Sequence, residues 1–225
     1  MKKKIFLFDL DGTLIDSSEG IINSVRYSVN KMGRELPDRE KLRSFIGPPL
    51  HESFEKIMGM KREEAEVGVR YFREYYNENG KDEMRPYKGI EKVLKTMSEN
   101  GELYVATSKY EPLAIKILDN LDFSKYFKKI TGSNENGTFS KKGDIIKYIL
   151  ETENVDMKNE EIYMIGDTKY DIIGANENNI KSIGVLYGFG TKEELEDSGA
   201  SYIVGFPGDI PDFKKRCIII MDKFR

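Results

Sequence analysis

The sequence has a single cysteine, Cys217, and therefore cannot form an intramolecular disulfide. Because proteins of oxidising compartments commonly carry paired cysteines, we expect a reducing, cytoplasmic location. Apolar residues 218–220 follow Cys217, which indicates ordinary packing rather than redox chemistry.

Long hydrophobic runs are also missing. The apolar run after the basic start, residues 5–8, is interrupted by Asp9 after four residues. That is about half the length of a short signal-peptide core. No stretch approaches the ~20 apolar residues of a membrane span. We therefore expect neither a secretory signal nor a membrane partner.

An excess of charge of either sign is absent as well. The 36 Lys and Arg residues nearly balance the 39 Asp and Glu residues, and the two signs are interleaved along the chain. Such a chain creates no field that would recruit nucleic acid, so we expect no nucleic-acid partner. With 39% hydrophobic residues and no low-complexity tract, 225 residues allow one large α/β domain or a core with a smaller partner.

Short apolar runs that end abruptly in polar residues or glycine are the main signal for secondary structure. They occupy residues 5–8, 103–106, 162–165, 183–186 and 202–204. Continuous runs of this kind are typical of strands buried on both faces. Amphipathic helical patterns lie between them, for example over residues 90–97. Alternating strands and helices predict an α/β fold with a doubly wound, Rossmann-like parallel sheet.

One interval departs from this alternation. The first strand ends near Asp9 and the next clear strand carries Thr107, whereas a βαβ unit needs only about 30 residues. Residues 17–82 show helical periodicity, and the pattern is interrupted by glycine and polar residues over 12–16 and by glycine, polar residues and proline over 80–86. We therefore predict an all-helical insert over 17–82 in a core formed by 1–16 and 83–225.

The first chemical motif is Asp9-Leu-Asp11-Gly12-Thr13, directly after the first predicted strand. Open α/β sheets bind ligands at this carboxyl edge. Two carboxylates held about 4 Å apart repel by roughly 4 kcal/mol at an effective dielectric of 20, so a cation should offset them. Taken in isolation, a solvated turn explains the motif equally well.

The second acidic motif, Gly166-Asp167-x-x-x-Asp171, follows the apolar run 162–165. Alone, this pair is better explained as capping of a helix N-terminus. Two acidic strand ends that meet at one sheet edge instead favour a hard cation with oxygen ligands, and Mg²⁺ suits that set.

Two further features fit a phosphate group. Thr107 and Ser108 end another predicted strand, where hydroxyl and backbone N–H groups can hold phosphoryl oxygens ahead of a helix. Lys142 begins a predicted helix over 144–150 and could neutralise a phosphoryl group, although a solvated pair with Lys141 is the plain alternative.

Four motifs thus occur in order: Asp9-x-Asp11-Gly-Thr, Thr107, Lys142 and Gly166-Asp167-x-x-x-Asp171. In these strand contexts the whole chain resembles the haloacid dehalogenase superfamily. The helical insert is similar to its C1 cap, and residues 45–50, 105–109, 132–133 and 137–138 resemble the 5′-nucleotidase-like branch, with phosphoglycolate phosphatases nearby.

The resemblance implies a mechanism. Asp9 would be the nucleophile that forms an aspartyl-phosphate intermediate, and Asp11 would act first as acid and then as base. The implied metal ligands for Mg²⁺ are Asp9, Asp11 through its backbone carbonyl, Asp167 and, in a supporting role, Asp171. The implied phosphate-binding groups are Gly12, Thr107, Ser108 and Lys142.

The resemblance implies hydrolysis of a small phosphate ester, such as a nucleoside 5′-monophosphate or phosphoglycolate, by a monomer or weak dimer. A phosphomutase of the same superfamily shares all four motifs and stays open, and a non-catalytic binding or signalling protein is a remote alternative. A dehalogenase would lack the second acid, Asp11. The insert is expected to close over the site, with specificity set around residues 47–49.

Overall fold

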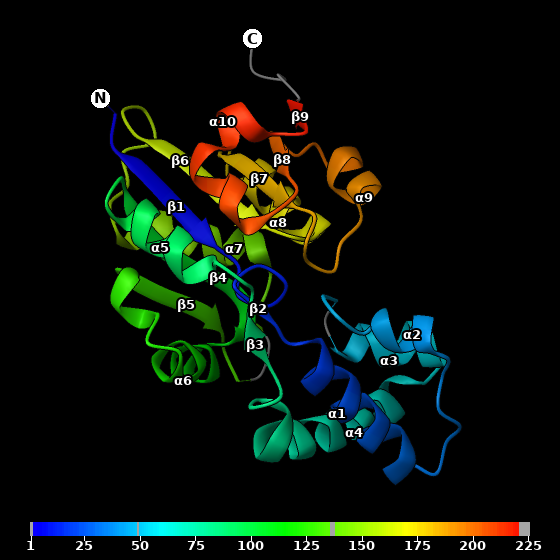
Figure 1. The fold of residues 1–225 in the computed structure, drawn as a ribbon. Coiled ribbons are helices and arrows are strands. Elements are labelled where there is room, and N and C mark those ends of the chain that lie inside the picture. Colours follow the sequence, from blue (N-terminus) through cyan, green and yellow to red (C-terminus); the bar gives the residue numbers. More distant parts are fainter. Residues whose placement is uncertain (1, 49, 136–137, 221–225) are drawn as a thin grey trace. The chain divides into compact units, whose positions relative to one another are not determined.

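A computed structural model of the chain describes residues 2–48, 50–135 and 138–220, and its ribbon is drawn in Figure 1. The chain divides into two compact units. One unit runs up to Ile15 and resumes at Pro86, and the other spans Asp16–Arg85. The crossings are the short strands β2 (Ile15–Asp16) and β3 (Arg85–Pro86), which pair in a two-stranded sheet.

The first unit is built on a twisted sheet with helices on both faces (Figure 1). Within the described residues its order is β5-β4-β1-β6-β7-β8-β9, in which neighbours are parallel except for the β8–β9 pair. The strands are β1 (Lys4–Phe8), β4 (Glu102–Tyr110), β5 (Lys129–Ser133), β6 (Glu161–Gly166), β7 (Lys181–Val185), β8 (Tyr202–Val204) and β9 (Ile219–Ile220). The predicted doubly wound α/β fold is confirmed, and β1 lies inside the sheet between β4 and β6.

The two faces of the sheet follow from the two-residue period of a strand. Ile5 and Leu7 of β1 pack with α7 (Lys142–Thr152) and α8 (Lys169–Glu177) in one buried cluster. Phe6 is directed to the other face, where it stacks on Tyr163 with ring centroids 5.7 Å apart. Each such buried side chain contributes roughly 1.5–3 kcal/mol.

The remaining helices of this unit complete the two layers. They are α5 (Ile90–Ser98), α6 (Glu111–Asn120), α9 (Lys192–Asp197) and α10 (Phe213–Arg216), with 3₁₀ helices η2 (Ser124–Tyr126) and η3 (Pro207–Asp212). On the face of Phe6, the Phe213 ring of α10 contacts Tyr163 edge-on at 4.9 Å. Leu195 of α9 packs with Ile172 of α8.

Strand β4 carries an irregularity that matters for the site. Its Ala106 pairs with Thr131 of β5, and the next paired residues are Tyr110 and Ser133. Four residue steps on β4 therefore oppose two on β5, which makes a bulge over residues 107–109. Bulges bend a strand and re-aim its side chains.

The second unit is helical. Its helices are α1 (Ser18–Lys31), α2 (Arg39–Arg43), α3 (Leu50–Met58) and α4 (Arg62–Tyr75), followed by a π-helical turn, η1 (Tyr76–Gly80). Phe45 and Phe54 meet edge-on at 5.1 Å in its core, and Gly68 of α4 lets the Phe54 ring approach closely. No helix in the described ranges is long and apolar enough to cross a bilayer.

Candidate active site

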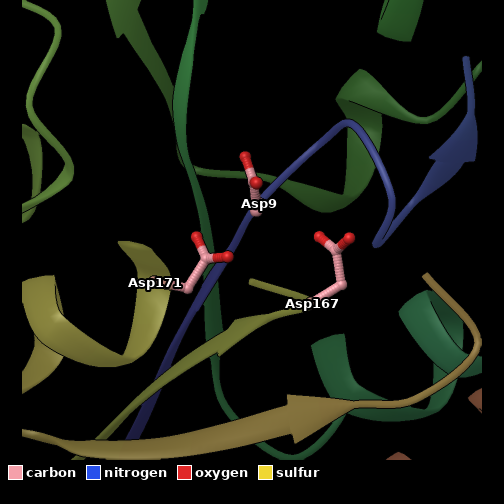
Figure 2. A group of neighbouring side chains, drawn as sticks. All are labelled: Asp9, Asp167 and Asp171. Carbon is pink, nitrogen blue, oxygen red and sulfur yellow. The ribbon is translucent and has the colours of Figure 1, made fainter. Parts of the chain in front are cut away.

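Three buried carboxylates meet at the carboxyl edge of the sheet. Asp9 follows β1, Asp167 follows β6, and Asp171 lies in the first turn of α8. One carboxylate oxygen of each lies within 4.8 Å of the other two. Figure 2 shows the three side chains beyond the strand ends. Because parallel neighbouring strands end at one edge, residues distant in sequence become neighbours here.

Lys142 supplies the cation beside this group. Its Nζ lies 2.7 Å from Oδ1 of Asp9 and 2.9 Å from Oδ1 of Asp171. It also donates a hydrogen bond to the carbonyl oxygen of Ala106 at 2.9 Å. The side chain is almost fully buried, so it is a component of the site and not one of a solvated surface pair.

Asp167 is held by two hydrogen-bond donors that the local sequence pattern does not indicate as its partners. The hydroxyl of Thr13 donates to Oδ1 at 3.2 Å, and the backbone N–H of Phe189 donates to Oδ2 at 2.8 Å. The hydroxyl of Tyr187 donates in turn to the carbonyl oxygen of Thr13 at 2.9 Å. The sequence signal was a glycine-flanked aromatic segment, residues 187–190, directly after the strand run 183–186.

Gly12 is required by both conformation and space. Its φ of +84° is in the left-handed region, and a Cβ there would lie 2.1 Å from Oδ2 of Asp167. Its N–H, expected to bind phosphate, donates to the carbonyl oxygen of Ile15 at 2.8 Å. In this structure Gly12 therefore serves the close approach of the loop to Asp167.

The electrostatics of the cluster fit a divalent cation. Burial raises the pKa of Asp9 to about 6, against the opposing charge of Lys142 and with help from Asp171. Burial and the neighbouring carboxylates of Asp171 and Asp9 raise the pKa of Asp167 well above its usual range. Burial would lower the pKa of Lys142, but Asp171 and Asp9 outweigh it and raise that pKa. Carboxylates that bind protons this readily have too little positive charge around them, even with Lys142 in place.

Asp11 lies apart from the three-carboxylate group. Both of its carboxylate oxygens lie 2.9 Å from Nζ of Lys109, a residue for which the sequence motifs predicted no role. Together the four aspartates and two lysines, if all ionised, leave a formal charge of −2. A hard divalent cation with oxygen ligands, such as Mg²⁺, fits this donor set and this charge.

The two hydroxyl candidates differ in placement. Thr107 is buried, and its Oγ1 accepts the backbone N–H of Lys109 at 3.2 Å. Ser108 is exposed and donates to the carbonyl oxygen of Ser140 at 2.9 Å.

Among the segments expected to mark the branch or set specificity, Pro49 and Gly137 lie outside the described residues.

The chain is similar to known proteins over most of its length. Residues 6–185 match the family model described as haloacid dehalogenase-like hydrolase. The chain is 40% identical over 190 residues to a 5′-nucleotidase of Pseudomonas aeruginosa, covering 84% of this chain and 85% of that one. It is 31% identical over 201 residues to the tyrosine-protein kinase PtkA of Mycobacterium tuberculosis, covering 89% of this chain and 68% of that one. The crystal structure of a predicted phosphatase from Clostridium acetobutylicum superposes with a TM-score of 0.88 at 42% identity, covering 94% of this chain and 98% of that one.

Proposed function

We propose that this chain, which belongs to the haloacid dehalogenase-like hydrolase family, hydrolyses a small phosphate ester in a Mg²⁺-dependent reaction through a phosphorylated Asp9. Its membership of the family and its phosphatase relatives make it a hydrolase of phosphoric monoesters. The observation that carries the proposal is the meeting of Asp9, Asp167 and Asp171 at the carboxyl edge of the sheet, with Lys142 paired to Asp9 and Asp171.

Asp9 is suited to attack phosphorus. Its Oδ1 accepts hydrogen bonds from Lys142 and from the backbone N–H of Leu10, at 2.7 Å each. We therefore assign the attack to Oδ2. Attack forms the Asp9–phosphorus bond as the bond to the leaving oxygen breaks, which divides one difficult displacement into two easier steps.

We assign proton transfer to Asp11. It protonates the departing oxygen and then takes a proton from the water that cleaves the aspartyl phosphate, which frees phosphate and restores Asp9. A Mg²⁺ ion would be held by Asp9, Asp167 and the backbone carbonyl of Asp11, with Asp171 in support. When bound, it supplies the positive charge that lets an anionic carboxylate approach an anionic phosphate.

We assign the helical residues 17–82 to the role of a cap that sets specificity. Because a 5′-nucleotidase shares 40% identity with this chain, nucleoside 5′-monophosphates are the substrate class that we favour. Phosphoglycolate is the alternative. We propose a cytoplasmic location, because both classes of ester are available there and because a single cysteine fits a reducing compartment.

The test is phosphate release by the purified protein across a panel of nucleoside monophosphates and short phosphoacids, with and without Mg²⁺. Asp9→Asn should abolish turnover, by at least about 10³-fold, with the melting temperature preserved. Asp119→Asn, on the exposed surface of α6, is the matched control and should keep full activity. Unchanged turnover in Asp9→Asn would refute the proposal.

A phosphotransferase is the second candidate, because one relative at 31% identity is named a kinase. The two reactions share the phosphorylated Asp9 and differ in the acceptor. Adding alcohols, sugars or tyrosine peptides to the assay separates them. Phosphate alone as product supports hydrolysis, whereas a phosphorylated acceptor formed in preference to phosphate supports transfer.

A further inference from the structure

The bulge in β4 brings a lysine to the acid of the proposed mechanism. Without an irregularity, β4 would continue its register with β5 beyond Ala106. The two extra residues break the alternation of side chains over 107–109. Lys109 consequently has its ammonium at Asp11, in the loop after the neighbouring strand β1.

The contact between these residues is a partly buried ion pair to both carboxylate oxygens. Nζ of Lys109 lies 2.9 Å from Oδ1 and 2.9 Å from Oδ2 of Asp11. Only 9% of the Lys109 side chain is exposed, against 23% for Asp11. Exposed ion pairs are weak because water competes with them, whereas a pair with one buried member holds its geometry better.

Lys142 already supplies positive charge on the side of the nucleophile. Its ammonium is engaged with Asp9, Asp171 and the carbonyl of Ala106. The two lysines thus divide the site, with one cation on the nucleophile and the other on the acid. This division indicates that the two lysines have different roles. Lys142 neutralises charge at the nucleophile, whereas Lys109 orients Asp11.

We propose that Lys109 is a positioning residue that holds the carboxylate of Asp11 in the orientation needed for proton transfer, an inference that rests on the proposed function. A carboxylate on a loop has several rotamers, and only some present an oxygen to the leaving group or to water. Misplacement of a reacting group by about 1 Å can cost about 100-fold in rate. Lys109 restricts Asp11 to one arrangement before the substrate arrives.

The test is a double-mutant cycle with Lys109→Met, Asp11→Asn and the combined variant, measured as kcat and KM. Two substrates are used in the presence of Mg²⁺. The aryl ester is p-nitrophenyl phosphate, and the alkyl ester is the one that the protein hydrolyses best in the substrate panel. Lys109→Met should lower kcat for the alkyl ester by about 10- to 100-fold, with KM within about twofold. In the Asp11→Asn background the same change should alter kcat by less than about twofold, because the group it positions is gone.

Two further variants make the result specific. Lys109→Arg keeps a two-oxygen contact with a carboxylate and should restore much of the lost rate. Lys169→Met removes another lysine–carboxylate pair, Lys169 with Glu194 at 3.2 Å, and should leave kcat unchanged. If Lys109→Met does not fold, as judged by its melting curve, Lys109→Gln replaces it in the same cycle.

The outcomes separate the two proposals. An equal loss of kcat in both backgrounds, an unchanged kcat, or a raised KM at constant kcat would each overturn the role of Lys109 while the phosphatase assignment stands. Wild-type protein that releases no phosphate from any ester would remove the proposed function, and the positioning role with it.

Discussion

Asp9 and Asp167 follow adjacent parallel strands, β1 and β6, and carry carboxylate oxygens within 4.8 Å of each other although 158 positions separate them in the sequence. Both are buried, and the cation that the structure places there, Lys142, contacts Asp9 and Asp171. This imbalance of buried charge leads to the first two predictions.

The first prediction concerns pH and Mg²⁺. The pKa of Asp9 is raised from 3.8 to about 6. In the metal-free protein, the proton on Asp9 therefore contributes its full stabilisation below about pH 3.8, and this stabilisation is lost as the pH rises through about 6. The loss is on the order of 3 kcal/mol. Mg²⁺ replaces the proton, so it should raise the melting temperature more at about pH 7.5 than at about pH 5. Calorimetry with and without Mg²⁺ checks this, and a larger shift at the lower pH would contradict it.

The second prediction concerns the support of Asp167. Tyr187→Phe removes the hydrogen bond to the carbonyl of Thr13, whose hydroxyl holds Asp167. Loss of such outer support typically weakens metal binding 10- to 100-fold, and we expect about 10-fold for this indirect contact. Titration calorimetry with Mg²⁺ measures it. Tyr104→Phe is the control, because that buried hydroxyl donates to Glu102 at the other end of the sheet.

The third prediction concerns Gly12. An alanine there would place Cβ 2.1 Å from Oδ2 of Asp167 and would hold a left-handed conformation at a cost of about 1–2 kcal/mol. We expect Gly12→Ala to lower kcat by about 100-fold because Asp167 must move. Gly33→Ala is a matched control, with φ of +65° and no heavy atom within 4 Å of the added Cβ. It should lose stability alone, and equal activity losses in both variants would refute the steric argument.

The fourth prediction concerns Glu102, at the start of β4. Partial burial would raise its pKa, but hydrogen bonds from Lys128, Lys3 and Tyr104 outweigh this and lower the pKa to about 2. Its stabilising effect is therefore present above about pH 4.5 and is lost as pH falls through about 2.

Glu102→Gln should lower the free energy of unfolding by about 1 kcal/mol at neutral pH, since the pair is partly exposed to water. The difference from wild type should vanish near pH 2. Urea denaturation across this range measures it, with Glu99→Gln on the exposed end of α5 as the control. A difference that stays constant with pH would argue for lost packing instead.

Much of the fold was predictable because buried parallel strands need continuous apolar runs. Strands β1, β4, β6, β7 and β8 lie at the five runs in the sequence. Strand β5 was not predicted, because its sequence Lys-Ile-Thr-Gly-Ser has a single strongly apolar residue and it lies at the sheet edge. Backbone pairing with β4 decides its conformation, because the buried residues of β5 are threonine, glycine and serine rather than apolar ones.

The candidate site divides in the same way. Aspartates placed directly after apolar runs predicted which carboxylates would share an edge, since every parallel strand ends there. The sequence did not identify Lys109, Thr13 or Tyr187 as partners. Their contacts depend on a bulge and on loops whose positions must be correct to about an ångström. Local periodicity in the sequence does not encode such positions.

The sequence by itself determined the order of strands and helices and the chemistry available at the strand ends, because both depend on local patterns of apolar and acidic residues. Only the tertiary structure decided which cation faces which carboxylate. Lys142 lies with Asp9, and Lys109 lies with Asp11. The pairing of each lysine with its carboxylate depends on strand register and on burial. Both are properties of the whole packed sheet, and together they determine the position of each charge.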